Sequence, residues 1–114
     1  MPYIGLKVSS EISDEKELEL KSALGKIITI IPGKSESGLM VCIEDRQKMY
    51  FRGNNDAPTA YVEVKIYGKS TPEAYNNMTA ALCETFMKLL GIPPDRTYIK
   101  YEECFIWGWN GKNI

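Results

Sequence analysis

The same order of elements is predicted twice along this chain of 114 residues. Residues 2–8 indicate a strand, and residues 61–67 alternate apolar and polar side chains as a half-buried strand does. Each is followed by a segment with apolar residues at helical spacing and then by a further strand. Two similar halves of about 57 residues favour an internal duplication. The expected fold is therefore a mixed α/β (α+β) one, in which two strand–helix–strand units form a four-stranded sheet with two helices on one face.

The first half carries clear end signals for its helix. Ser13 is a suitable N-cap, and the Pro32-Gly33 pair is expected to stop the helix. Residues 38–43 predict a buried strand, residues 48–51 a second short strand or an extension of the first, and residues 52–58 a loop dense in turn formers.

The second helix is expected to begin after Thr71, with Pro72 in its first position, and to end at Gly91. Residues 97–101 predict another strand, and the chain closes with a short strand and a glycine turn. Val62 and the alternate residues of its strand are expected to face the helices. The other face of the sheet then carries large, partly apolar side chains that need a cover, which favours self-association. These are Tyr61, Lys65, Tyr67, Tyr98 and Lys100.

Composition excludes several classes of protein. The chain has no histidine, so Ser-His and Cys-His nucleophile pairs and His-ligated metal sites are excluded. Cys42, Cys83 and Cys104 are far apart, odd in number and without a CxxC pair, so buried free thiols in a reducing compartment are expected, and no metal site. A net charge of −1 with no basic stripe argues against nucleic acid as a partner. The longest apolar run, residues 27–31, is too short for insertion into a membrane.

Five short motifs occur in order along the chain. They are MP at the start, GK at 33–34, MYFRGNN at 49–55, PPDRTYIKY at 93–101 and GWN at 108–110. With these motifs the chain resembles the macrophage migration inhibitory factor family of the tautomerase superfamily over essentially its whole length. The resemblance implies one tautomerase-like domain over residues 1–114, with Met1 removed in the mature protein. It also implies a homotrimer whose sheets form a barrel with active sites at the subunit boundaries.

The resemblance implies that Pro2 is catalytic. After removal of Met1, Pro2 carries a secondary amine, and an apolar pocket close to lysine ammonium groups lowers the pKa of such an amine. A neutral amine acts as a general base. The implied activity is that of a cofactor-independent isomerase, a keto–enol tautomerase of the phenylpyruvate or dopachrome type. Its substrates are small aromatic carboxylates such as phenylpyruvate-like α-keto acids.

Further site residues follow from the same resemblance. Lys34 matches a lysine that holds the substrate carboxylate, Tyr98 a pocket tyrosine from the neighbouring subunit, and Trp109 the tryptophan of the GWN turn. Each of these residues also has an interpretation without a role in binding. Lys34 is then a solvated lysine after the helix, Tyr98 an ordinary aromatic residue of a subunit interface, and Trp109 a residue that stacks to hold the terminal strand. Tyr67 occupies the position at which family members contact the substrate through a backbone N–H. The resemblance implies the same contact here, with the bulky Tyr67 ring narrowing the pocket. Lys100 replaces a substrate-binding asparagine, which makes the pocket more cationic.

Two other departures limit what the resemblance implies. Lys65 replaces a common histidine, and residues 59–62 lack the CxxC of some members, so thiol-oxidoreductase activity is not expected. An alternative function is a cytokine-like signalling protein that binds a cell-surface receptor, with the pocket vestigial. A third interpretation is a structural homologue with an inactive pocket. The start of the chain lacks the apolar segment of a signal peptide, so a cytoplasmic location, or secretion by an unconventional route, is expected.

Overall fold

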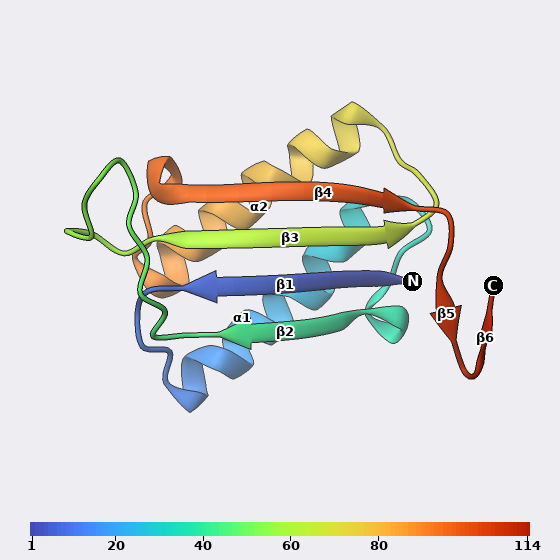
Figure 1. The fold of residues 1–114 in the computed structure, drawn as a ribbon, viewed down its shortest axis with the longest axis horizontal. Helices are drawn as coiled ribbons and strands as arrows, with labels where there is room; N and C mark the ends of the chain where they lie inside the picture. Colours follow the sequence, from blue (N-terminus) through green and yellow to red (C-terminus); the bar gives the residue numbers. More distant parts are fainter.

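The computed structural model describes residues 1–114. Four long strands and two helices account for the body of the molecule (Figure 1). In chain order they are β1 (Pro2–Val8), α1 (Asp14–Ile27), β2 (Met40–Glu44), β3 (Ala60–Tyr67), α2 (Pro72–Leu90) and β4 (Thr97–Cys104). The last segment forms a two-stranded hairpin of β5 (Gly108–Trp109) and β6 (Lys112–Asn113).

The sheet has the strand order β2-β1-β3-β4. β1 is parallel to β2, and β3 is parallel to β4, while β1 and β3 are antiparallel in the middle. Each parallel pair is joined through one helix, so the two predicted strand–helix–strand units are confirmed. The central pairing places Pro2 opposite Ile66.

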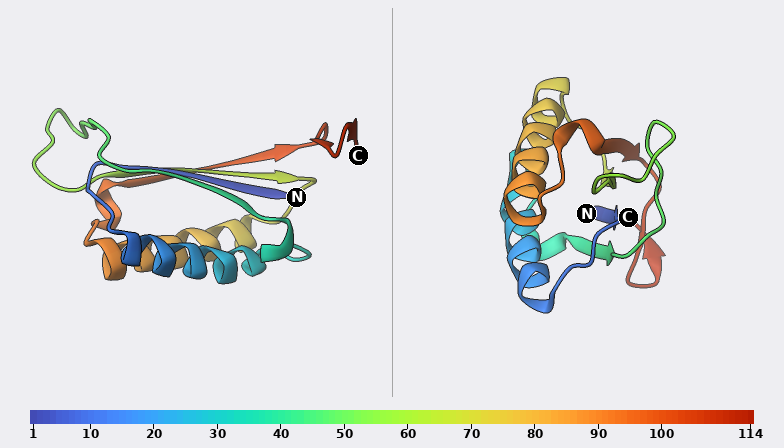
Figure 2. Two further views of the ribbon diagram at one scale, coloured as in Figure 1. Left: turned by 90° about the horizontal axis from the view of Figure 1, so that it is seen from below. Right: turned by 90° about the vertical axis from the view of Figure 1, so that its left-hand side faces the viewer.

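Both helices cover the same face of the sheet (Figure 2). The hydrophobic core lies between these two layers and contains 17 buried residues. Alternate residues of β1 and β3 point into it, including Ile4, Val62 and Ile66, and Leu24 and Phe86 meet them from α1 and α2. Burial of this apolar surface is the main stabilising term for the two-layer arrangement.

The helix ends follow the sequence signals closely. The Ser13 side chain accepts a hydrogen bond from the backbone N–H of Lys16, and Thr71 caps α2 in the same way. Gly91 ends α2 in the left-handed conformation, with a φ of 67° that glycine adopts without strain. α1 ends at Ile27, earlier than Pro32-Gly33 predicted, because the chain tightens into a 3-10 turn over Ile28–Ile30.

The face of the sheet away from the helices carries the large side chains that the alternation predicted. Tyr61 lies opposite Tyr98, and Lys65 and Tyr67 lie further along β3 on the same face. Tyr98 is 63% exposed and Lys100 is also exposed, so β4 contributes an uncovered part of this face.

Three predictions are wrong. Residues 48–51 form no strand, because Arg52 and Gly53 make a tight turn with positive φ and Phe51 bridges only to Asn54. β2 is an exposed edge strand rather than a buried one, because only β1 pairs with it. The cysteines are free as expected but none is buried: Cys42 is exposed, and Cys83 and Cys104 are half-buried.

Neither helix combines the length and apolar content needed to cross a lipid bilayer.

Candidate functional site

A cavity of about 660 Å³ lies at the end of the sheet where β1 begins. The start of the chain, the segment before β2 and the terminal hairpin all meet at this end (Figure 1). The residues that line it are Met1, Pro2, Tyr3, Ser37, Gly38, Leu39, Met40, Lys65, Trp107, Gly108 and Trp109. Of the six predicted site residues, Pro2 and Trp109 therefore line one cavity, and no carboxylate is among its lining groups.

The backbone at Gly38 approaches Pro2 closely. A Cβ at Gly38 would lie 3.7 Å from the Pro2 Cδ atom and 3.9 Å from the Met1 nitrogen. Pro2 itself is buried in the chain. A Cβ at Gly38 would therefore be in ordinary van der Waals contact with the start of the chain, and Gly38 lines the same cavity as Pro2.

Lys34 lies beside the start of β1. Its Nζ donates a 2.8 Å hydrogen bond to the backbone carbonyl of Tyr67, the residue that follows the β1 partner Ile66. Burial, and after it the positive charge of Lys34, lower the pKa of the Met1 α-amino group. An amine at this position therefore loses its proton more easily than an ordinary α-amino group does.

The backbone of Tyr67 holds the first peptide group. Its N–H donates a 2.9 Å hydrogen bond to the Met1 carbonyl oxygen. That oxygen belongs to the peptide bond that includes the Pro2 nitrogen, so removal of Met1 would free the Tyr67 N–H to donate to another acceptor next to Pro2.

The side chain of Tyr67 holds the terminal hairpin. Its hydroxyl donates a 3.0 Å hydrogen bond to the Ile114 carbonyl, and its ring contacts Trp107 edge-on with centroids 6.5 Å apart. The Ile114 N–H in turn donates to the Trp107 carbonyl. Tyr67 thus supports the wall formed by Trp107 and Trp109, in addition to presenting its backbone to the site.

Tyr98 and Lys100 lie away from this cavity. In the register of the sheet, Pro2 on β1 pairs with Ile66 on β3, and Ile66 pairs with Glu103 on β4. Tyr98 is five residues from Glu103, or about 17 Å along the strand, and Lys100 is three residues or about 10 Å. Within one chain, Tyr98 therefore lies toward the far end of the sheet from Pro2, and Lys100 lies midway along β4.

A clamp of hydrogen bonds fixes the surroundings of Tyr98. Arg96 donates through Nε to the Thr59 hydroxyl at 3.0 Å and through its two terminal nitrogens to the side chain and backbone oxygens of Asn54, both at 3.1 Å. The Arg96 guanidinium also lies 5.5 Å from the centroid of Phe51. Phe51 meets the Tyr98 ring edge-on at 5.1 Å.

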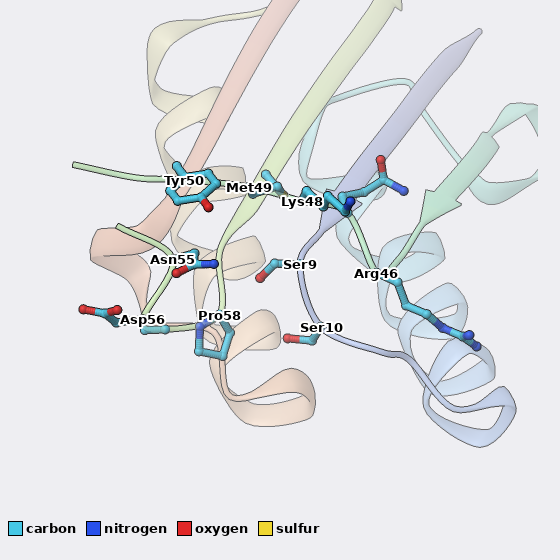
Figure 3. Close-up of a pocket in the computed structure, with 11 residues that line it drawn as sticks. Ser9, Ser10, Arg46, Lys48, Met49, Tyr50, Asn55, Asp56 and Pro58 are labelled. Atoms are coloured by element: carbon cyan, nitrogen blue, oxygen red, sulfur yellow. The ribbon is translucent and has the colours of Figure 1, made fainter. Parts of the chain in front are cut away.

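A second cavity, of about 690 Å³, lies at the opposite end of the sheet (Figure 3). It is formed by the end of β1 and the long loop before β3, and Ser9, Ser10, Tyr50 and Asn55 surround it in Figure 3. None of the predicted site residues lines it, so its larger volume does not make it the candidate site. No group of three or more His, Cys, Asp or Glu side chains is placed to hold a metal ion anywhere in the chain.

The cavity at the start of β1 brings together the groups needed to move a proton on an anionic molecule. It combines an amine with a lowered pKa, a lysine ammonium group and a backbone N–H aimed at the first peptide group. Aromatic side chains supply flat apolar walls beside them.

Comparison with known proteins gives the chain a family. The model of the macrophage migration inhibitory factor family matches residues 1–114. Macrophage migration inhibitory factor of Mus musculus is 33% identical over 84 residues, which cover 72% of each chain. The chain belongs to the macrophage migration inhibitory factor family.

Solved structures of family members share the fold over the full length. The crystal structure of Leishmania major MIF2 is 34% identical with a TM-score of 0.91, and the match covers 100% of this chain and 97% of that one. A macrophage migration inhibitory factor homologue from Prochlorococcus marinus is 32% identical with a TM-score of 0.80, covering 97% of each chain. The predicted family and the predicted four-stranded fold are both confirmed.

The cavity contains residues that sequence reasoning did not place in a site. Tyr3, Gly38, Met40 and Trp107 line it without having been predicted, and Lys65 had been noted only as a departure from the family. The alternation in β3 predicted that Lys65 faces away from the helices together with Tyr67. Only the register with β1 puts Lys65 next to Pro2, because Lys65 and Tyr67 flank the Pro2 partner Ile66. No sequence pattern indicated that Trp107, next to the terminal hairpin, lines a cavity together with Pro2.

Proposed function

We propose that this member of the family is a keto–enol tautomerase of small aryl α-keto acids such as phenylpyruvate, with Pro2 as the general base. The observation that supports the proposal most strongly is the environment of the amino group at the start of the chain. Burial and Lys34 lower the pKa of an amine at this place, and the Pro2 nitrogen is one residue further into the same cavity. The proposal includes removal of Met1, because the Pro2 nitrogen is an amide until then.

In the proposed reaction the substrate carboxylate binds the ammonium group of Lys34. The Pro2 nitrogen takes a proton from C3 of the keto form, and the electrons of that C–H bond form the C2–C3 double bond. The C2 carbonyl oxygen takes up the displaced electron pair and then the proton that Pro2 carries, which gives the enol and returns Pro2 to the neutral amine. In this proposal the Tyr67 N–H, released from the Met1 carbonyl, donates to a substrate oxygen.

The aryl group of the substrate fits the apolar part of the cavity. Trp107 and Trp109 come from the hairpin, and Tyr3 and Met40 come from β1 and β2. Offset and edge-on contacts between aromatic rings add to the stabilisation from burial alone.

The complete site in this proposal is formed in a homotrimer. Tyr98 and Lys100 lie too far from Pro2 to reach a shared ligand within one chain, so a neighbouring chain supplies them. β2 and β4 are edge strands with one unpaired side each, and the uncovered sheet face with exposed Tyr98 offers the surface for such contacts.

The decisive experiment compares three forms of the protein, with masses confirmed by mass spectrometry. Protein without Met1 is expected to accelerate phenylpyruvate tautomerisation, while protein that retains Met1 and the Pro2→Gly variant are expected not to. Equal rates in the forms with and without Met1 would overturn the role of Pro2. A processed protein no faster than buffer would overturn the proposed activity on this substrate.

A second candidate function rests on the name of the family, which describes inhibition of macrophage migration. In this alternative the protein is a signalling ligand for a cell-surface receptor and the cavity is vestigial. Inhibition of macrophage migration by the purified protein, retained in Pro2→Gly, would favour signalling without catalysis. Absence of any effect on migration, with tautomerase activity present, would leave the enzyme as the function.

A further inference from the structure

Lys65 places a second ammonium group in the cavity, beyond the one that Lys34 supplies beside it. Lys65 is half-buried on the open face of β3 and lines the cavity together with Pro2 and Tyr3. Neither Lys34 nor Lys65 is ion-paired, since the four salt bridges of the chain all involve other residues. No acidic residue lines the cavity. The two ammonium groups therefore give the cavity enough positive charge to bind a ligand with more than one anionic group.

Two acidic residues neighbour Lys65 on the open face of the sheet: Glu102, its register partner on β4, and Glu63, two residues earlier on β3. The Glu102 carboxylate instead accepts a 3.7 Å contact from the thiol of Cys104 on its own strand. Lys65 therefore lines the cavity without a salt bridge. Burial raises the pKa of the Cys104 thiol on β4, and the charge of the Lys65 ammonium group also acts on this thiol by lowering its pKa. Glu102 and Glu63 are the residues that would compete with a ligand for Lys65.

The two lysines lie at the same end of the sheet. Lys34 is fixed at the Tyr67 carbonyl, and Lys65 lies two residues before Tyr67 on the same face, a step of about 7 Å along the strand. Lys65 lines the cavity beside which Lys34 lies, so a ligand whose carboxylate binds Lys34 and whose body fills the cavity has the Lys65 side chain in its wall.

We infer that the preferred ligands are dianions: aryl α-keto acids, or related acids, that carry a second anionic group at the far end of the molecule, bound by Lys65. This inference rests on the proposed function for the identity of the first group, and it names the substrate class within it. A neutral ring substituent would leave Lys65 without a partner in a partly desolvated site.

Binding tests this inference without turnover. The probes are 3-(4-carboxyphenyl)propanoate and its 4-carbamoyl isostere, which have the same shape, differ by one charge and lack the oxo group needed for tautomerisation. Trp107 and Trp109, the only tryptophans of the chain, both line the cavity, so their fluorescence reports binding directly. The wild-type protein is expected to bind the dianion about tenfold more tightly at low ionic strength, the size typical of one partly desolvated ion pair.

Variants assign the preference to a residue. Lys65→Gln is expected to abolish the tenfold preference, Lys65→Arg to keep it, and Glu102→Gln to increase it. Lys7→Gln is the matched control, because Lys7 lies on the same face at the other end of β1, opposite Tyr61. A preference that survives Lys65→Gln, or that Lys100→Gln removes instead, would overturn the assignment to Lys65, and equal binding of the two probes by the wild type would overturn the inference itself.

The binding experiment tests the dianion preference independently of the proposed tautomerase activity. Phenylpyruvate turnover by the same wild-type sample tests the tautomerase activity, since phenylpyruvate lacks the second charge. A tautomerase without a dianion preference would fail only the present inference. A protein that prefers the dianion but does not turn over phenylpyruvate would fail only the proposed substrate and leave the ligand class in place.

Discussion

The Nζ atom of Lys34 lies 2.8 Å from the carbonyl oxygen of Tyr67. This bond joins the segment after α1 to the end of β3, and it fixes a positive charge beside the first amine of the chain. A side chain held in this way loses less conformational freedom on binding a ligand than a solvated lysine would. The relationship supports the interpretation of Lys34 as a binding residue over that of a solvated surface lysine.

Lys34→Gln should weaken binding of carboxylates. We expect the KM for phenylpyruvate to rise by about tenfold or more, because the amide cannot replace the positive charge. Steady-state kinetics on Lys34→Gln and on Lys26→Gln, an exposed lysine in the last turn of α1, provide the test. Equal KM values in the two variants would mean that Lys34 does not bind the substrate.

The hydroxyl of Tyr67 should order the terminal hairpin. Tyr67→Phe removes only the bond to Ile114, and we expect a local destabilisation of about 1 kcal/mol or less. Faster amide hydrogen exchange at Ile114, whose N–H donates to Trp107, is the measurement. Tyr50→Phe, at a tyrosine that is 71% exposed, is the control. Unchanged exchange at Ile114 would show that packing of Trp107 alone holds the hairpin.

Arg96 should stabilise the loop that carries Phe51. Arg96→Gln loses hydrogen bonds to Thr59 and Asn54, so we expect the free energy of unfolding to fall by about 2 kcal/mol. Arg52→Gln is a matched control: Arg52 also lies over the Phe51 ring, at 5.3 Å, but makes no such hydrogen bonds. We expect a loss within about 0.5 kcal/mol for that variant. Equal losses in urea unfolding would assign the effect to the ring contact rather than to the hydrogen bonds.

Glu103 should make stability depend on acid pH. Its pKa is lowered by a hydrogen bond from the Tyr75 hydroxyl at 2.7 Å, by the Ser70 N–H at 3.0 Å and by the charge of Lys69. The unfolded state therefore takes up the proton at a higher pH than the folded state. The stabilisation is present above about pH 4.3, the ordinary value for glutamate, and is lost as the pH falls through the lower folded pKa.

Melting temperatures of the wild type and of Glu103→Gln measure this effect. The difference between the two proteins should be greatest near neutral pH and should shrink as the pH falls below about 4. Glu102→Gln, the adjacent residue on β4, serves as the control. A constant difference at all pH values would contradict the linkage. The same Tyr75 hydroxyl has its pKa raised to about 12, by burial first and then by Glu103, so it contributes no titration near neutral pH.

Subunit boundaries can be tested by mixing inactive variants. Pro2→Gly and Tyr98→Ala should each lack activity, and refolding them together should restore it. About a quarter of the sites in a random mixture combine an intact Pro2 with an intact Tyr98 from a neighbour. A mixture no more active than its components would mean that both residues serve one site from the same chain, or that Tyr98 serves none.

The sequence predicted those parts of the molecule that local physical chemistry determines. The caps at Ser13 and Thr71 and the alternation around Val64 each depend on near neighbours, and all three were predicted correctly. The two strand–helix–strand units were predicted from their repetition along the chain. The strand order was not predicted, and the edge position of β2 was missed because an apolar run has the same pattern in an edge strand and in a central strand.

The site was predicted less completely than the fold, because it depends on contacts between distant parts of the chain. Pro2 and Trp109 were predicted from motifs and lie in one cavity. The contribution of Trp107 depends on the hairpin folding back to Tyr67, a contact between distant parts of the chain that leaves no periodic signal. Lys65 required the register between β1 and β3, which alternation alone does not supply.

The pH dependence of kcat/KM for phenylpyruvate, on protein shown by mass spectrometry to begin at Pro2, tests the role of Pro2 most directly. A general base must be unprotonated, so activity should rise with pH and level off. The apparent pKa should be lower than that of an ordinary α-amino group, because the burial and the Lys34 charge that lower the pKa of the Met1 amine should also act on the adjacent Pro2 amine. A rate that does not change between about pH 5 and 9, where such an amine titrates, would contradict Pro2 as the base.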